Sequence, residues 1–184
     1  MIDDIEKAAR LRNGRATFVS LVKRPANRKR LIVKSDGSYE GYSDKIRKDA
    51  LRGLLYVTIY EPNVVDSRDD MMEKADLESL AHQFLLDGFQ DNIDYEHSYK
   101  KGMGTTVESF ILRGSDPMFP DSRPGSWCAA IQLAKAAMPY IDVINGVSWA
   151  GGAIREQKSD DIEPIARFSK DSTVSRDIPI VRFN

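Results

Sequence analysis

Apolar residues recur with a helical period between residues 73 and 88. Members of this set share one helix face through the i, i+3, i+4, i+7 and i+8 spacing: Leu77, Leu80, Ala81, Phe84 and Leu85. Gly88 follows the set and suits the end of a helix, because glycine readily adopts the left-handed backbone that closes one. The spacing predicts an amphipathic helix with a buried apolar face. His82 lies off that face, so we expect it at the surface.

Runs rich in β-branched and aromatic residues, bounded by turn residues, predict strands. The expected strands cover residues 16–22, 30–33, 54–60, 92–97, 105–112, 126–133 and 153–155, and a further one is predicted at 165–168. Residues 92–97 and 105–112 are predicted to pair as a hairpin through the loop 98–104. The polar segment 44–52 indicates only a connecting helix or loop.

Shorter helices are predicted at two places. Residues 5–11 are expected to form a helix that ends near Gly14, which gives an N-terminal helical segment over residues 1–15. Residues 139–144 are expected to form another, because proline suits a first helical turn. The tail over 172–184 is predicted to be an extended arm or edge strand. The pattern therefore predicts a strand-rich α+β fold in which two or three helices pack outside the sheet, with residues 1–184 in a single domain.

Composition and charge narrow the class of protein. The chain is 41% apolar and 30% charged with a net charge of −1, which is ordinary for a globular protein and gives no sign of nucleic-acid binding. The longest apolar run, 54–60, is too short to cross a bilayer, and the acidic N-terminus lacks the pattern of a signal peptide. We therefore expect a cytoplasmic protein with neither membrane nor nucleic acid as a direct partner. The single cysteine, Cys128, excludes an internal disulfide and a Cys-rich zinc site.

Two charged segments have more than one interpretation. The basic cluster, residues 23–34, contains Lys23, Arg24, Arg28, Lys29, Arg30 and Lys34. It is typical of a solvated edge that discourages aggregation between sheets, and docking of an acidic partner is the alternative. The aspartates of segment 66–70 can hold calcium, but the alternating ligands and closing glutamate of a calcium loop do not follow. We accordingly predict no metal and no cofactor.

Ser148 stands in the glycine-rich stretch 145–152, after a predicted helix and at the start of a predicted strand. A serine hydroxyl becomes a good nucleophile when a base removes its proton, and histidine suits that task near neutral pH. Since His82 is expected on the polar side of a helix, His97 is the predicted base. On spacing alone, a tight turn and a surface histidine explain the same residues, and that interpretation stays open.

A nucleophilic serine also needs donors for the developing oxyanion. The backbone N–H groups of Gly151 and Gly152 are the predicted donors, because glycine allows a close approach. Arg155 can assist them, and its alternative interpretation is a surface charge at a strand end. Cys128 is no rival nucleophile, because no flanking charge lowers its pKa, and we expect it in the core.

A third group should orient the imidazole of His97. Asp94, Glu96, Glu108 and Asp171 are the acidic candidates. Alternation along a strand puts Asp94 and Glu96 on the face opposite His97, which argues against both. Glu108, on the predicted neighbouring strand, is therefore preferred. A metal site here is not predicted, because no second histidine accompanies these acids.

Several segments, taken in order, resemble the XkdF-like phage serine proteases, relatives of the prohead (head-maturation) proteases and, more distantly, of herpesvirus assemblins. The similar segments are 18–27, 33–35, 60–67, the helix at 77–84, 93–97, 106–109, 125–127 and the serine motif. Together they cover about residues 16–155 of the chain.

The resemblance implies a prohead-protease fold, with a β-barrel-like core, mainly antiparallel, and helices outside. His97 matches the family's histidine and Ser148 its nucleophile. In related prohead proteases a segment similar to residues 20–26 follows the catalytic serine, whereas here it precedes it, which implies a circularly permuted arrangement. The serine motif also departs from the expected Gly-x-Ser-x-Gly-Gly, because Trp149 and Ala150 put one extra residue before the glycine pair.

The leading hypothesis is a phage serine endopeptidase that cleaves scaffold or capsid-protein extensions, and itself, during head maturation. The resemblance implies the capsid scaffold and the major capsid protein as partners, self-association into a homo-oligomer, and a location in the host cytoplasm inside the assembling prohead. The alternative is a catalytically inactive capsid-assembly or scaffold-binding module on the same fold. An esterase that uses the same Ser148 and His97 pair differs only in its substrate.

Overall fold

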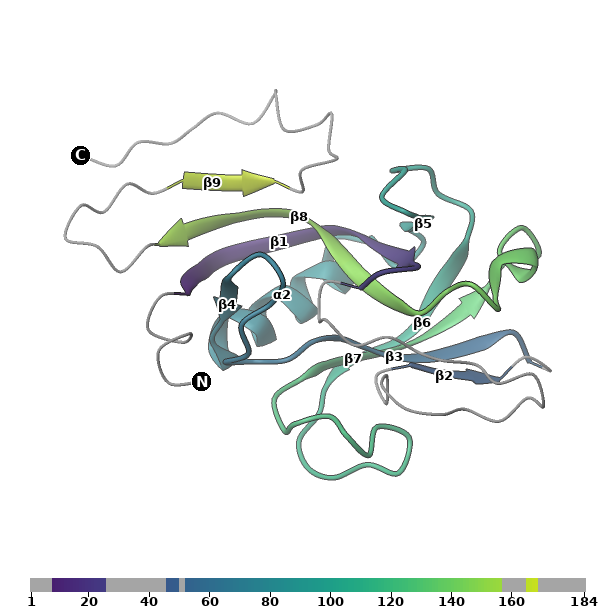
Figure 1. Cartoon of the computed structure of the whole chain (residues 1–184), viewed down its shortest axis with the longest axis horizontal. Helices are drawn as coiled ribbons and strands as arrows, with labels where there is room; N and C mark the ends of the chain where they lie inside the picture. Colours follow the sequence, from purple (N-terminus) through teal and green to yellow (C-terminus); the bar gives the residue numbers. More distant parts are fainter. Residues whose placement is uncertain (1–7, 26–45, 50–51, 157–164, 169–184) are drawn as a thin grey trace.

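The computed structural model describes residues 8–25, 46–49, 52–156 and 165–168, and these form two sheets with an α-helix between them (Figure 1). The first sheet follows the order β4 (Asp70–Met72), β1 (Ala9–Val22), β8 (Gly146–Glu156) and β9 (Ile165–Phe168), and β5 (Ile93–Tyr95) also pairs with β1. The second sheet has the order β2 (Ile46–Asp49), β3 (Leu54–Tyr60), β7 (Trp127–Leu133) and β6 (Gly104–Ile111). The remaining elements are the helix α2 (Lys74–Leu86) and the short 3₁₀-helix η1 (Met138–Tyr140).

Strand β1 is the centre of the first sheet. Along one edge it runs antiparallel to β8, and along the other it runs parallel first to β4 and then to β5. Figure 1 shows β1 and β8 side by side across the molecule. Both edges of β1 are therefore hydrogen-bonded, which explains how a strand with polar residues at Arg12, Asn13 and Arg15 extends over 14 residues.

The core lies between the two sheets and receives the apolar face of α2. Leu77, Leu80 and Phe84 are fully buried, as the helical spacing predicts, and His82 is exposed. Phe84 meets the buried Trp127 of β7 edge to face, with ring centroids 5.6 Å apart. The helix ends in a Schellman arrangement, because Gly88 has φ of 75° and the amides of residues 88 and 89 bond back to the last turn.

Most predicted strands are confirmed within one or two residues, including β3, β6, β7 and β9. The predicted strand at 30–33, the tail at 172–184 and most of the basic cluster lie outside the described residues. Segment 46–49, which carries no clear pattern, forms β2 and pairs antiparallel with β3. The neighbouring strand supplies the order that its own polar sequence does not.

Three expectations about the fold are corrected. The sheets are not closed into a barrel among the described elements, and α2 is the single α-helix there. Ala9–Leu11, the described end of the predicted N-terminal helix, is the start of β1, because β4 pairs with it residue by residue. In place of the predicted helix at 139–144 there is only η1. The broad α+β class is consistent with the structure, and no helix in its described part is long and apolar enough to cross a bilayer.

The predicted hairpin of residues 92–97 and 105–112 is also wrong. Strand β5 belongs to the first sheet and β6 to the second, so the two do not form a ladder. Alternation identified both segments as strands, but it contains no information about which strand each one pairs with. Two hydrogen bonds still hold the segments near each other, from the amide of Met103 to the carbonyl of Ile93 and from the amide of Thr106 to that of Gln90.

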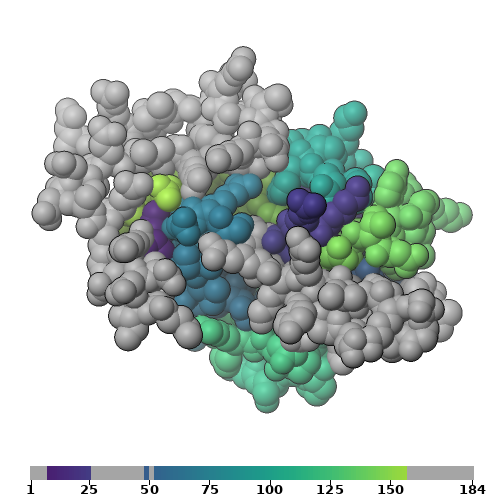
Figure 2. Space-filling model, in the orientation of Figure 1, coloured from purple at the N-terminus to yellow at the C-terminus, as the bar shows by residue number. Residues whose placement is uncertain are grey.

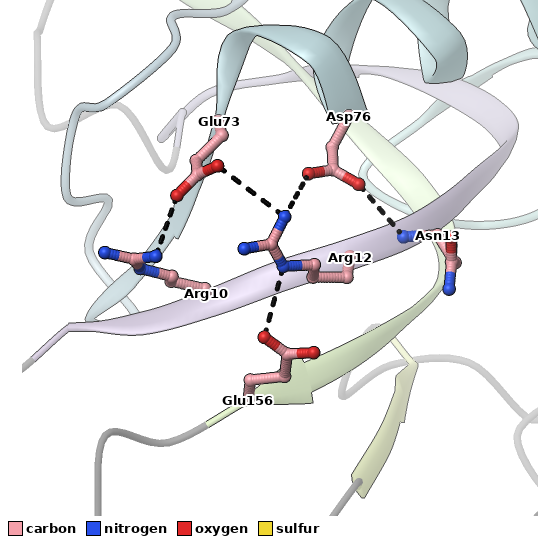
Figure 3. A network of polar contacts seen from close by, with 6 residues as sticks. All are labelled: Arg10, Arg12, Asn13, Glu73, Asp76 and Glu156. Carbon is pink, nitrogen blue, oxygen red and sulfur yellow. Dashed lines mark hydrogen bonds and ion pairs between the residues drawn. The ribbon is translucent and has the colours of Figure 1, made fainter.

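A polar network joins the start of α2 to both long strands (Figure 3). The guanidinium of Arg12 on β1 lies 3.1 Å from Glu156 on β8, 3.2 Å from Asp76 and 3.6 Å from Glu73. The hydrogen bond to Glu156, followed by the negative charge of Glu73, raises the pKa of Arg12. Arg10 adds a pair with Glu73 at 2.9 Å. This network fixes the angle at which α2 lies against the β1 and β8 pair.

Gly151 marks a close approach of β8 to β1. A Cβ atom at this position would overlap the carbonyl oxygen of Arg15 and press on Ala16. The ladder is irregular at the same place, with register shifts between Arg12 and Arg15 and between Ala16 and Phe18. Glycine is therefore required here by backbone packing.

We expect Gly151→Ala to destabilise the protein by about 3 kcal/mol or more, because the backbone of β1 would have to move. Urea unfolding followed by tryptophan fluorescence measures the change. Gly114→Ala is the matched control, because a Cβ there meets nothing within 4 Å, and it should change stability by less than about 0.5 kcal/mol. Equal unfolding midpoints for the two variants would contradict the close approach.

Arg155 near the far end of β8 pairs with Asp70 of β4. The Nε atom of Arg155 lies 2.6 Å from Asp70 Oδ1, and the two side chains are only 17% and 4% exposed. Strand β1 lies between β8 and β4, so this ion pair spans the central strand. Removing one partner of a buried ion pair leaves a charge without its counterpart and is strongly destabilising.

Replacement of Arg155 by methionine should cost about 3 kcal/mol of unfolding free energy, and adding Asp70→Asn should restore part of that loss. Chemical denaturation of the two single variants and the double variant measures the coupling. Arg15→Met provides the control, since its pair with Asp87 is largely exposed on the arginine side and should be worth less than about 1 kcal/mol. Equal losses for Arg155 and Arg15 would refute a structural role for the buried pair.

Candidate active site

Three polar residues form a row across the first sheet. The register pairs Ser20 of β1 with Ser148 of β8 on one side and with Asp94 of β5 on the other. Residues at paired positions of neighbouring strands present their side chains on the same face of a sheet. Asp94, Ser20 and Ser148 therefore share one face, and the apolar Val19 and Leu21 point from the opposite face into the core.

His97 reaches this row because the chain turns sharply after β5. The amide of Ser98 bonds to the carbonyl of Tyr95, and the two residues between them, Glu96 and His97, have φ of 52° and 56°. Positive φ at both central positions is the geometry of a type I′ turn. Such backbone is uncommon for residues other than glycine and asparagine, and it concentrates at functional sites. The turn, rather than strand alternation, aims the imidazole.

The imidazole of His97 contacts Ser20. Its Nδ1 atom lies 2.9 Å from Ser20 Oγ, within hydrogen-bond distance. Ser20 is fully buried, whereas His97 and Ser148 are partly exposed. Within the described part of the chain Ser148 Oγ bonds to the carbonyl of Trp149 at 3.5 Å, and no hydrogen bond links it directly to His97. The structure thus brings the two predicted residues to the same place through a third, Ser20.

Asp94 is the buried acid of the site. Its side chain is 0% exposed, and its Oδ2 accepts a hydrogen bond from the amide of Tyr99 at 2.6 Å. Its Oδ1 is also buried and has no hydrogen-bond partner among the described residues. Alternation argued against Asp94 because it assumed that the strand continues to His97, but β5 ends at Tyr95. Asp94 is therefore on the face of Ser20 and close in space to the turn that holds His97.

Aromatic side chains surround the turn. Phe18 of β1 meets Tyr99 edge to face at 5.4 Å, and Tyr95 stacks on Tyr140 of η1 at 4.8 Å. The ammonium of Lys23 lies 5.6 Å from the centre of the Tyr95 ring. Figure 2 shows the end of β1 at the surface, next to the segment after β5 and the segment from η1 into β8. These three segments border the side of the molecule where Ser148 and His97 are accessible.

The other predicted site residues lie farther away. Glu108 is exposed on β6 in the second sheet, where it pairs with Ala130, and it is not hydrogen-bonded to His97. Gly151 and Gly152 are inside the β8 ladder, and Gly151 lies about 10 Å along the strand from Ser148. Arg155 is farther along β8 and engages Asp70. None of the four contacts the row in the described structure, so their catalytic roles stay predictions.

Ser20 was not a candidate on sequence grounds. The signal that could have found it is a single hydroxyl within the apolar run Val19 to Val22, because a buried polar group needs a partner. Cys128 is buried as predicted and lies 3.8 Å from the Thr58 hydroxyl. Asp66 accepts bonds from the amides of Arg68 and Asp70, and burial raises the pKa of its carboxyl. The described residues contain no cluster of three or more metal-binding side chains.

Comparison with known proteins adds to this geometry. Residues 45–156 match a protein-family model described as "Putative phage serine protease XkdF". The matched region includes His97, Asp94 and Ser148, whereas β1 with Ser20 precedes it. No solved structure gives a significant match.

Two curated proteins of Bacillus subtilis (strain 168) are similar over most of the chain. The phage-like element PBSX protein XkdF is 31% identical over 155 residues, which is 79% of this chain and 55% of that protein. The uncharacterized protein YqbD is 30% identical over 166 residues, or 86% of this chain and 50% of that protein. The chain spans about half the length of both relatives. By the family match and by these identities, it belongs to the XkdF family of phage serine proteases.

Proposed function

We propose that this protein is a phage prohead serine endopeptidase in which Ser148 is the nucleophile and His97 the general base. The observation that carries the proposal is the convergence of His97 on the paired residues Ser20 and Ser148. A buried serine and a partly exposed one stand side by side, and the accessible one is the better nucleophile for a polypeptide substrate. Membership of a phage serine protease family supports the same chemistry.

The reaction follows the course of acyl transfer to serine. Ser148 Oγ attacks the carbonyl carbon of the scissile peptide while His97 takes the hydroxyl proton. The tetrahedral oxyanion collapses, the C–N bond breaks, and His97 gives its proton to the leaving amine. Water then attacks the acyl-enzyme with His97 again as base, which releases the new carboxyl end and restores Ser148. This route uses no metal and no cofactor.

The proposed substrates are extensions of the capsid scaffold and of the major capsid protein, and the enzyme itself. The proposed location is the host cytoplasm, inside the assembling prohead, where the protein self-associates. Support comes from the resemblance to head-maturation proteases and from the name of the similar protein, which assigns it to a phage-like element. Since the chain covers about half of that relative, these assignments are proposals about the whole protein.

A second function is a non-catalytic assembly or scaffold-binding module on the same fold. The absence of a direct bond between Ser148 and His97 among the described residues favours it, although catalytic hydrogen bonds often tighten only when substrate binds. Lys23 and Arg24 are exposed and suit contact with an acidic scaffold. Charge reversal at these two residues should weaken scaffold binding if this module is the correct assignment.

Purified protein incubated with its cognate scaffold protein should cleave it, and Ser148→Ala and His97→Ala should each lower the rate by roughly 10³-fold or more. The reason is that one removes the nucleophile and the other its base. Gel electrophoresis and mass spectrometry of the new termini measure cleavage.

Matched controls are Ser115→Ala and His82→Ala, which remove an exposed serine and an exposed histidine elsewhere. Both should cleave at the wild-type rate. Scaffold that is bound but never cut by the wild-type protein would replace the protease proposal with the assembly module. Undiminished cleavage by both site variants would reject Ser148 and His97 as the catalytic pair.

A further inference from the structure

Ser20 occupies a position that simple burial does not explain. It is a hydroxyl inside an apolar stretch, fully buried, and the group that it contacts is the candidate base rather than a backbone carbonyl. Thr17 on the same strand provides the contrast, because its hydroxyl donates to the carbonyl of Ala150 at 3.3 Å. The Ser20 hydroxyl instead holds one defined nitrogen of an imidazole.

We propose that Ser20 is the positioning residue for His97, and that the buried Asp94 orients the Ser20 hydroxyl from the neighbouring strand. This inference rests on the proposed peptidase function, in which His97 acts on Ser148. It assigns the third place of a catalytic triad to a serine backed by a carboxylate, instead of to Glu108.

Proton accounting supports this order. If His97 acts as a base through Nε2, its neutral ring carries the proton on Nδ1, and that N–H donates to Ser20 Oγ across the observed 2.9 Å. The hydroxyl proton of Ser20 then needs an acceptor on another side. Asp94 is at the paired position of β5, on the same sheet face, and its Oδ1 is a buried acceptor without a partner in the described structure.

Asp94 also fixes the backbone that carries His97. Its Oδ2 holds the amide of Tyr99, just beyond the type I′ turn. One carboxylate therefore anchors the turn with one oxygen and faces the serine row with the other. A negative charge behind Ser20 stabilises the imidazolium that forms when His97 takes a proton, as the buried carboxylate of a serine protease triad does.

The nearby alternative acid does not serve this purpose. Glu96 precedes His97, but its side chain is exposed and its Oε1 accepts a hydrogen bond from the amide of Lys23 at 2.6 Å. That bond ties the turn to the end of β1. Glu96 is therefore bound on the side of the turn away from the buried row.

The activity test compares Ser20→Ala, Ser20→Thr and Asp94→Asn with wild type, using cleavage of the cognate scaffold. Ser20→Ala should lower kcat by roughly 10- to 100-fold and leave KM nearly unchanged, because it loosens the base without touching substrate. Ser20→Thr keeps the hydroxyl and should recover most of the rate. Asp94→Asn should lower kcat and move the acidic limb of the pH–rate profile to lower pH, because the imidazolium loses a stabilising charge.

Thr17→Val is the matched control, since it removes a hydroxyl from the same strand that bonds β8 rather than His97. It should leave kcat and its pH profile unchanged. Thermal unfolding of every variant separates loss of fold from loss of positioning. A fall in kcat for Thr17→Val as large as that for Ser20→Ala would overturn the assignment, because any lost hydroxyl on β1 would then have the same effect.

A second readout does not depend on activity. Nitrogen NMR of ¹⁵N-histidine-labelled protein should show neutral His97 protonated at Nδ1 in wild type and in Thr17→Val, and a loss of that fixed tautomer in Ser20→Ala. An unchanged tautomer in Ser20→Ala would overturn the positioning role. If wild type cleaves no scaffold yet the tautomer responds as expected, the peptidase proposal fails while the contact between Ser20 and His97 stands.

A fluorophosphonate probe with peptide mapping resolves the remaining alternative. The adduct should form on Ser148 in wild type and in Ser20→Ala, more slowly in the latter. An adduct on Ser20 that disappears in Ser20→Ala and persists in Ser148→Ala would overturn the proposal, because Ser20 would then be the nucleophile.

Discussion

The antiparallel pairing of β1 with β8 is the constraint on which the candidate site depends. It joins residues more than one hundred positions apart and sets Ser20 directly opposite Ser148. Because side chains alternate along a strand, a slip of one residue would turn one of the two serines to the other face. Gly151 permits the close approach of the two backbones, and the Arg12 network and the pair of Arg155 with Asp70 tie their far ends to α2 and β4. Residues remote from the chemistry therefore hold its register.

The placement of His97 depends on a local backbone conformation of higher energy. Left-handed residues at Glu96 and His97 end β5 and turn the chain back over the sheet, and each such residue costs about 1 kcal/mol or more. Burying Asp94 with one unpaired oxygen adds a further cost. The surrounding contacts offset both, through the bonds to Tyr99 and from the amide of Glu96 to the carbonyl of Leu21. Unfavourable local features at one end of a well-packed sheet are what a preorganised site requires.

The resemblance to head-maturation proteases and the structure agree on one unusual point. The apolar segment containing Ser20 precedes the serine motif in this chain, yet β1 and β8 are neighbours in space. A permuted order of segments can preserve the same pair of strands, because sheet pairing does not depend on which strand is synthesised first. The family match contains His97 and Ser148, and the strand that contributes Ser20 comes from outside the matched region.

The sequence by itself determined the elements whose signals are local. The period of Leu77, Leu80 and Phe84 defined α2 and its buried face, alternation and β-branched residues located most strands, and the order of motifs identified the family and the pair Ser148 and His97. Pairing partners, by contrast, depend on contacts between distant segments. The sequence could not show that β5 joins β1 rather than β6, or that Ala9–Leu11 extends a strand instead of ending a helix.

Only the tertiary structure decided which groups surround His97. Alternation placed Asp94 away from the histidine because it could not anticipate a type I′ turn without glycine, in which the period of two no longer holds. Ser20 had no motif of its own and gained a possible role only when β1 was set between β5 and β8. The residue types that can do the chemistry are written in the sequence. Their neighbours are set by strand register, which is a property of the whole fold.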